Sequence, residues 1–225
     1  MRLTFLGHAA VRLEFGDADV LVDPFLDGNP LATVGPSELA PTHVLLTHGH
    51  GDHVGDTVAL AKAAGATVVA SVETARWLAA QGVADAVGIN LGGGIDLAFG
   101  RVSLHPAWHS NSLPDGSYGG MPAGVLIEAG GVRIYHAGDT ALFSDLALVG
   151  RRGLDLALVP IGDHFTMGPD DALEAVRLLA PRRVVPIHYD TFPQIRQDAA
   201  AFAARVASET DARCDVLAPG RALDL

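Results

Sequence analysis

Three histidines and one aspartate fall within six consecutive residues, in the segment His48–His53 with the sequence HGHGDH. Imidazole nitrogens and carboxylate oxygens are the ligands that Zn²⁺ and similar divalent ions take in proteins. His48 and His50 lie two positions apart, so in an extended loop they project to the same side and can bind one ion. Asp52 and His53 can reach a second ion close by. Chance clustering in a chain with 10 histidines is the alternative, but the tight spacing favours a metal site.

Three more candidate ligands each stand just past the end of a predicted strand: His109, Asp139 and His188. Sheet proteins tend to place their sites at the carboxyl ends of strands, so these side chains can converge with the HGHGDH segment on one rim. The segment alone cannot complete the coordination of two ions. Considered alone, each of these three residues favours a structural role. Considered together with the HGHGDH segment, all three are predicted to be metal ligands.

Asp52, His8 and His164 are the candidate catalytic residues. We expect Asp52 both to ligate a metal and to orient the attacking hydroxide. His8 and His164 follow predicted strands and could contact the leaving group or the developing oxyanion, with a satisfied structural histidine as the alternative for each. Asp23 also follows a strand and could hold a ligand imidazole in one tautomer, with an ordinary turn aspartate as its alternative.

The elements that must position these residues follow from apolar periodicity and from turn and cap residues. Strands are predicted at Arg2–Gly7, Val11–Phe15, Asp19–Asp23, His43–Thr47, Ala66–Ala70, Ile95–Phe99, Arg101–Ala107, Gly124–Glu128, Val132–His136, Leu154–Pro160 and Arg183–Ile187. Helices are predicted at Thr57–Ala64 (capped by Asp56 and stopped by Gly65), Glu73–Gln81, Pro169–Leu179 and Gln194–Ser208. Strands in clusters with helices between them favour two sheets flanked by helices. No linker divides the chain, so we expect one domain over residues 1–225.

The composition is that of an acidic globular protein. Of 225 residues 49% are hydrophobic, and 15 basic against 26 acidic side chains give a formal charge of −11. Such a surface repels phosphate backbones, so we expect no nucleic-acid partner. No apolar run approaches the roughly 18 residues that span a bilayer, and no signal-peptide pattern opens the chain, so we expect a cytoplasmic protein with no membrane partner. The single cysteine, Cys214, excludes an intramolecular disulfide framework, while a homo-oligomer stays open.

The order of these motifs resembles that of the metallo-β-lactamase superfamily: the His48–His53 segment, His109, Gly138-Asp139-Thr140 and His188. Further segments look like a branch of single-domain metal-dependent hydrolases related to bacterial L-ascorbate-6-phosphate lactonase: Gly7-His8, Asp23-Pro24, Gly162–Pro169 and His188–Pro193. The resemblance covers almost the whole chain. It implies a four-layer αββα sandwich of the α/β class with the site on one edge.

The resemblance also implies how the ligands divide between two ions. His48, His50 and His109 would hold the first ion, Asp52, His53 and His188 the second, and Asp139 would bridge them. Zn²⁺ is the favoured ion, and Mn²⁺, Fe²⁺ and Ni²⁺ accept the same ligands. A metal-bridging hydroxide would then attack an ester, lactone, thioester or phosphodiester. Two cations outweigh the local carboxylates, so we expect a small anionic substrate.

Two alternatives use the same scaffold. One is a mononuclear iron redox enzyme that acts on persulfides or oxygen, although Asp52 and His188 favour a complete second metal site. The other is a metal-dependent binding protein without catalytic activity, since a fold does not determine function. Metal identity and number would separate the first alternative from a dinuclear hydrolase, and turnover would separate the second.

Overall fold

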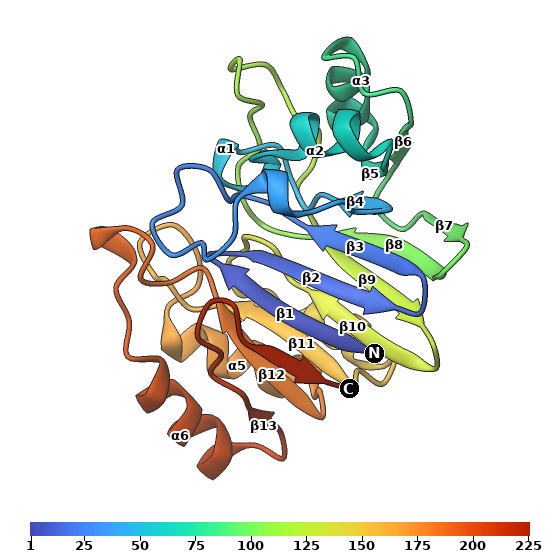
Figure 1. Cartoon of the computed structure of the whole chain (residues 1–225). Coiled ribbons are helices and arrows are strands. Elements are labelled where there is room, and N and C mark those ends of the chain that lie inside the picture. The colour runs from blue at the N-terminus through green and yellow to red at the C-terminus, as the bar shows by residue number, and fades with distance from the viewer.

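The computed structural model, which describes residues 1–225, contains two seven-stranded sheets that pack face to face (Figure 1). The first sheet has the order β14-β1-β2-β3-β4-β5-β6. Its strands are β1 (Arg2–Gly7), β2 (Ala10–Phe15), β3 (Ala18–Val22), β4 (His43–Leu45), β5 (Thr67–Ser71), β6 (Ala86–Ile89) and β14 (Ala222–Asp224). Pairs are antiparallel from β14 to β3 and parallel from β3 to β6.

The second sheet repeats this arrangement, with the order β13-β12-β11-β10-β9-β8-β7. Its strands are β7 (Gly94–Leu97), β8 (Gly100–Pro106), β9 (Ala123–Ala129), β10 (Val132–His136), β11 (Leu156–Pro160), β12 (Arg183–Ile187) and β13 (Arg213–Cys214). Pairs are antiparallel from β7 to β10 and parallel from β10 to β13. The short strands β6, β13 and β14 were not predicted, because each carries too few alternating residues to stand out.

Apolar side chains of both sheets form the central core. Leu3, Val11 and Val20 of the first sheet share one buried cluster with Val125 and Leu158 of the second. Alternate residues of a strand point to opposite faces, so the same strands present a second apolar face to the helices outside. The result is the predicted αββα sandwich, which the structure confirms.

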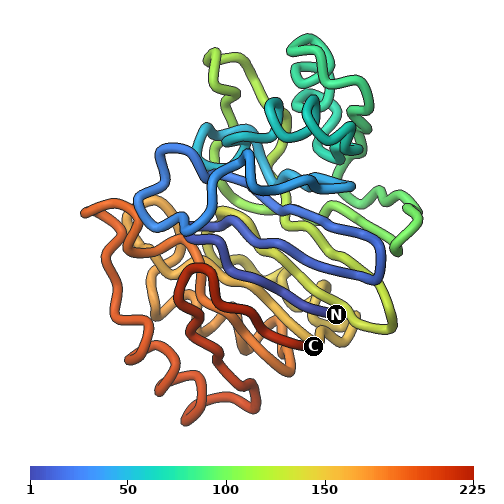
Figure 2. The backbone as a smooth tube through the Cα atoms, viewed as in Figure 1, coloured from blue at the N-terminus to red at the C-terminus, as the bar shows by residue number.

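Helices cover the outer face of each sheet. Apolar residues of α2 (Thr57–Ala64) and α3 (Val72–Ala80) pack on the first sheet, and those of α5 (Pro169–Leu179) and α6 (Ala199–Glu209) pack on the second. Shorter helices are α1 (Gly51–Val54), α4 (Leu146–Gly150), η1 (Pro36–Glu38) and η2 (Pro193–Ile195). None of the helices combines the length and apolar character needed to cross a membrane. The two chain ends lie side by side because β14 pairs with β1 (Figure 2).

The predicted bounds of α2 are confirmed, but one predicted side-chain cap and one predicted helix start need correction. Asp56 stands at the start of α2, but its carboxylate accepts the backbone N–H groups of Leu26 and Asp27, both at 2.9 Å, and does not cap the helix. The last helix begins at Ala199 and not at residue 194, because Asp198 caps it through the N–H of Ala201. The prediction that Gly65 stops α2 is confirmed, with Gly65 in the left-handed region at φ +69°.

Candidate metal centre

The strands that precede the candidate ligands all end at one edge of the sandwich. In the first sheet β1 and β4 are parallel to each other, and His8 and the HGHGDH segment follow them. In the second sheet β8, β10 and β12 run the same way, so the residues that follow them meet at that edge. The N–H of His188 donates to the carbonyl of His8 at 2.7 Å, which joins the two sheets there.

The first group of candidate ligands contains three imidazoles, from His48, His50 and His109. One nitrogen of each lies within 4.8 Å of the others, and Nε2 of His48 is 3.0 Å from Nδ1 of His50. The Thr47 hydroxyl donates to Asp23 at 2.6 Å, so it accepts from Nδ1 of His48 at 3.0 Å. This leaves the lone pair on Nε2 of His48 facing the other two imidazoles, as a metal ligand requires.

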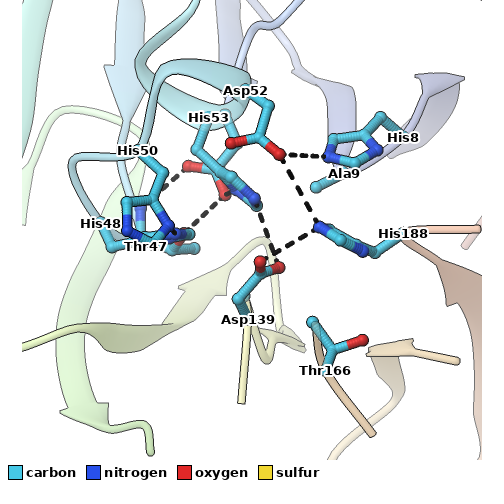
Figure 3. A network of polar contacts seen from close by, with 12 residues as sticks. His8, Ala9, Thr47, His48, His50, Asp52, His53, Asp139, Thr166 and His188 are labelled. Carbon is cyan, nitrogen blue, oxygen red and sulfur yellow. Dashed lines mark hydrogen bonds and ion pairs between the residues drawn. The ribbon is translucent and has the colours of Figure 1, made fainter. Parts of the chain in front are cut away.

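The second group contains Asp52, His53 and His188, joined by His8. Asp52 and His53 belong to the single turn of α1, which turns both side chains toward the second sheet (Figure 3). Nε2 of His188 lies 4.0 Å from Oδ2 of Asp52. The structure thus brings the Asp52, His53 and His188 set together in the grouping that the resemblance implied.

Asp139 lies between the two groups (Figure 3). One of its carboxylate oxygens is 3.3 Å from Nε2 of His53, and the other is 3.1 Å from Nε2 of His188 and 3.5 Å from Nε2 of His109. Its side chain is buried. A carboxylate that faces ligands of both groups is placed as a bridging ligand would be.

Several polar atoms of this cluster are buried without a hydrogen-bond partner: Nε2 of His53, Oδ1 of Asp139, and both ring nitrogens of His188. Leaving a polar atom unpaired in the interior costs about 1–3 kcal/mol, so such atoms call for an explanation. Nε2 of His53 and of His188 and Oδ1 of Asp139 converge on one region, and a divalent cation would satisfy all three. The donor set therefore fits a metal centre.

Asp23 fixes the orientation of His53 through Nδ1, the ring nitrogen that does not face Asp139. Its Oδ2 accepts from Nδ1 of His53 at 2.8 Å and from the Thr47 hydroxyl, while its Oδ1 accepts the Thr47 N–H at 2.9 Å. Asp23 thereby holds a proton on Nδ1 of His53, and Nε2 points toward Asp139, where a bound cation would take the place of a second proton. This contact is the one that the role suggested for Asp23 from sequence requires.

Charge is distributed so that a cation is stabilised at this point. Burial opposes protonation of His53, but Asp139 and Asp23 raise its pKa well above 6.5. Burial likewise opposes ionisation of Asp139, yet His53 and His188 hold its pKa well below 3.8. Burial lowers the pKa of His48 well below 6.5, which keeps that imidazole neutral and able to ligate.

Comparisons with known proteins agree with this geometry. A family model described as the beta-lactamase superfamily domain matches residues 19–189. The chain belongs to the metallo-β-lactamase superfamily. A UPF0173 metal-dependent hydrolase of Thermus thermophilus is 55% identical over 225 residues, which is 100% of this chain and 99% of that protein. A UPF0173 metal-dependent hydrolase of Deinococcus radiodurans is 49% identical over 205 residues, 90% of each chain.

Among solved structures, that of Igni18, a metallo hydrolase from the archaeon Ignicoccus hospitalis, superposes with a TM-score of 0.90. Its identity is 34%, and the match covers 100% of this chain and 98% of that one. The superfamily fold thus extends over the whole chain, including β14 beyond the region that the family model matches.

Within this metallo-β-lactamase fold, the two candidate catalytic histidines differ sharply in position. His8 is fully buried, and Nε2 lies 3.2 Å from Oδ2 of Asp52 while Nδ1 is 2.9 Å from the Thr191 hydroxyl. Burial lowers the pKa of His8 to about 4, so the ring is neutral. His164 is exposed, stacks edge-on against Phe165 and does not reach the ligand cluster.

A cavity of about 600 Å³ opens above the candidate ligands of this metallo-β-lactamase fold. Its wall consists of His50, Gly51, Asp52, His109, Ser110, Ser112, Leu113, Pro114, Asp139, Phe165 and His188. The loop from residue 111 to 122 supplies Ser112, Leu113 and Pro114 to this wall. Thr47 and Thr191 were missed as supporting residues, since a lone threonine carries no signal in sequence.

Proposed function

We propose that this protein is a hydrolase that uses two divalent metal ions to cleave an ester, lactone or phosphodiester. The observation that carries the proposal is Asp139, a buried carboxylate between two groups of ligands, with Nε2 of His53 and of His188 unpartnered beside it. Relatives at 55% and 49% identity are named metal-dependent hydrolases, which supports the same class of activity.

In this proposal each ion has its own ligands. His48, His50 and His109 would hold the first ion and Asp52, His53 and His188 the second, and Asp139 faces both groups. Zn²⁺ suits this set of imidazoles and carboxylates, and Mn²⁺, Fe²⁺ and Ni²⁺ accept the same donors. Ions in such a site lower the pKa of bound water from 15.7 to about 7, so that a hydroxide is available at neutral pH.

The protein side chains then orient the reactants. Burial raises the pKa of Asp52, but the hydrogen bond from His8, together with the charges of His53 and His8, outweighs burial and holds the pKa below the usual value, so Asp52 is ionised at neutral pH. An ionised Asp52 at the cavity wall can accept a hydrogen bond from the attacking water and set its direction. The water oxygen forms a bond to the acyl carbon or phosphorus, the bond to the leaving oxygen breaks, and a proton passes to that oxygen. Because His8 is buried behind Asp52, we assign it to positioning this carboxylate.

Metal content tests the proposal most directly. The protein is purified without chelator or nickel affinity, and metal per chain is measured by plasma mass spectrometry. We expect close to two ions, loss of hydrolysis on removal of both, and recovery when two equivalents of Zn²⁺ or Mn²⁺ are returned. A single iron per chain would overturn the dinuclear assignment and favour redox chemistry on persulfides.

A further inference from the structure

The cavity above the metal centre contains no lysine or arginine among its wall residues. Its floor is made of candidate metal ligands, and the remaining side chains are two serines, Ser110 and Ser112, and an apolar group of Leu113, Pro114 and Phe165. The chain has a formal charge of −11. A negatively charged group of a substrate that lies away from the metals would therefore meet no lysine or arginine side chain in this cavity.

Four large exposed apolar side chains belong to the two segments that supply the apolar residues of the cavity wall. Phe165 is 52% exposed, and Trp108, Tyr118 and Met121 are more than half exposed as well. The last three belong to the 108–122 segment, which also supplies Leu113 and Pro114 to the cavity wall. Of the four, Phe165 lines the cavity itself, so its exposed ring is available to contact a ligand there.

The wall formed by Leu113 is tied to the first group of ligands. Oδ1 of Asn111 accepts the N–H of Gly49 at 2.7 Å, and Nδ2 of Asn111 donates to the carbonyl of Gly119 at 3.0 Å. A Cβ at Gly49 would come within 2.9 Å of both Asn111 and Leu113, so a larger residue there would have to displace these two side chains. This wall is therefore held at a fixed position relative to His48 and His50.

The part of the wall formed by Phe165 is tied to the segment that carries Asp139. The N–H of Met167 donates to the carbonyl of Thr140, the neighbour of Asp139, at 3.1 Å. The 163–168 turn is closed by a hydrogen bond from the Thr166 N–H to the carbonyl of Asp163 at 2.6 Å, and Thr166 lies close to Asp139 and His188 (Figure 3). Both apolar walls are thus set in place before a substrate binds.

Resting on the proposed function, we propose that the substrate carries an uncharged, apolar substituent that lies between Leu113 and Phe165, and no phosphate or carboxylate outside the reacting group. Burying an unpaired anion away from the metals is unfavourable, whereas each methylene group placed against the two walls is favourable. The two serine hydroxyls can accommodate an ether, hydroxyl or amide on the same substituent. The sequence led us to expect a small anionic substrate. The cavity restricts that expectation to substrates whose charge, if they carry one, lies at the bond that is cleaved.

Alkyl hydroxamates test this inference without knowledge of the substrate, because the hydroxamate binds the metals and the chain probes the walls. On zinc-loaded protein, whose zinc content is checked by plasma mass spectrometry, affinity is measured by calorimetry from acetohydroxamate to octanohydroxamate. We expect two- to fourfold tighter binding for each added methylene. Octanohydroxamate should bind at least tenfold more tightly than the monohydroxamate of suberic acid, which has the same length but ends in a carboxylate.

Three variants locate the effect on the walls. Leu113→Ala and Phe165→Ala should each flatten the dependence on chain length, and Leu113→Arg should improve binding of the suberic acid probe relative to octanohydroxamate. Leu148→Ala is the matched control, because Leu148 is 54% exposed on α4 and is absent from the cavity wall. Circular dichroism verifies that each variant is folded.

The outcomes separate this inference from the proposed function. Affinity that is independent of chain length, or tighter binding of the suberic acid probe, would overturn the inference while hydrolysis of p-nitrophenyl esters could still uphold the function. If the affinity depends on chain length but no ester, lactone or phosphodiester is hydrolysed, the proposed function is wrong and the proposed class of ligand stands. Protein that takes up no zinc would overturn both.

Discussion

Replacing Asp23 with asparagine should weaken metal binding through the tautomer of His53, without touching a ligand. Asp23 accepts three hydrogen bonds, from Nδ1 of His53 and from the hydroxyl and N–H of Thr47. Asparagine keeps only one acceptor oxygen. If that oxygen stays opposite the Thr47 N–H, the amide NH₂ faces His53, and the imidazole must move its proton to Nε2, the atom that would bind the metal. If the amide is turned over, its NH₂ meets the Thr47 N–H instead.

Each orientation leaves a buried donor or acceptor without its partner, which costs about 1–3 kcal/mol. That range brackets the 10- to 100-fold loss of metal affinity that changes behind metal-bound histidines typically cause. We therefore expect Asp23→Asn to lower Zn²⁺ affinity by about 10- to 100-fold in competition with a chromophoric chelator. The metal-free protein should lose less stability than the loaded one, because a proton on Nε2 can be donated to the unpartnered Oδ1 of Asp139.

Asp19→Asn is the control for this experiment. Asp19 lies on β3, the strand that directly precedes Asp23, and pairs with Arg12 at 2.8 Å at the end away from the metals. Its loss should cost less than about 1 kcal/mol of stability and leave Zn²⁺ affinity unchanged. Wild-type affinity in Asp23→Asn would refute the assignment of Asp23 as the residue that sets the His53 tautomer.

Four further outcomes are expected. Asp139→Ala and His50→Ala should each lose at least one metal per chain by plasma mass spectrometry and abolish hydrolysis; full activity in either would contradict the site. Chelation should lower the melting temperature by roughly 5–11 °C per ion. An ion present at 100 times its Kd stabilises the folded protein by about 2.7 kcal/mol, and 1 kcal/mol shifts the Tm of a chain of this size by about 2–4 °C. An unchanged Tm would count against a buried metal centre. Gly162→Ala should destabilise by about 1–3 kcal/mol in urea and reduce metal content, because its Cβ would fall 2.2 Å from the carbonyl oxygen of His188; wild-type stability would show that this loop can move. Burial raises the pKa of Cys214 to about 12, so a thiol reagent at pH 8 should label the native protein at least tenfold more slowly than the urea-unfolded one, and equal rates would show an accessible thiolate.

The convergence of the candidate ligands could be predicted from sequence because its signals are local. The HGHGDH segment is contiguous, and His109, Asp139 and His188 each follow an apolar run long enough to identify a strand. The carboxyl ends of parallel strands share an edge, so the strand pattern alone was enough to expect the convergence.

What could not be predicted depends on contacts between residues far apart in the chain. Asp56 follows the sequence rule for a helix cap, yet its carboxylate binds backbone N–H groups about 30 positions earlier, which local chemistry does not reveal. Asn111 reaches Gly49 across 62 positions, and His8 reaches Thr191 across 183. His164 follows a strand like the ligands do, but the turn after β11 points it outward.

The division of the ligands between the two sheets has a consequence for biosynthesis. The HGHGDH segment emerges from the ribosome with the first sheet, whereas His109, Asp139 and His188 arrive only with the second. A nascent chain that stops short of residue 188 can offer an ion only a partial set of donors, so high-affinity loading must wait until the two halves have docked. The proposed ions would then bind only after the two sheets have packed together, and metal occupancy would indicate that the chain has finished folding.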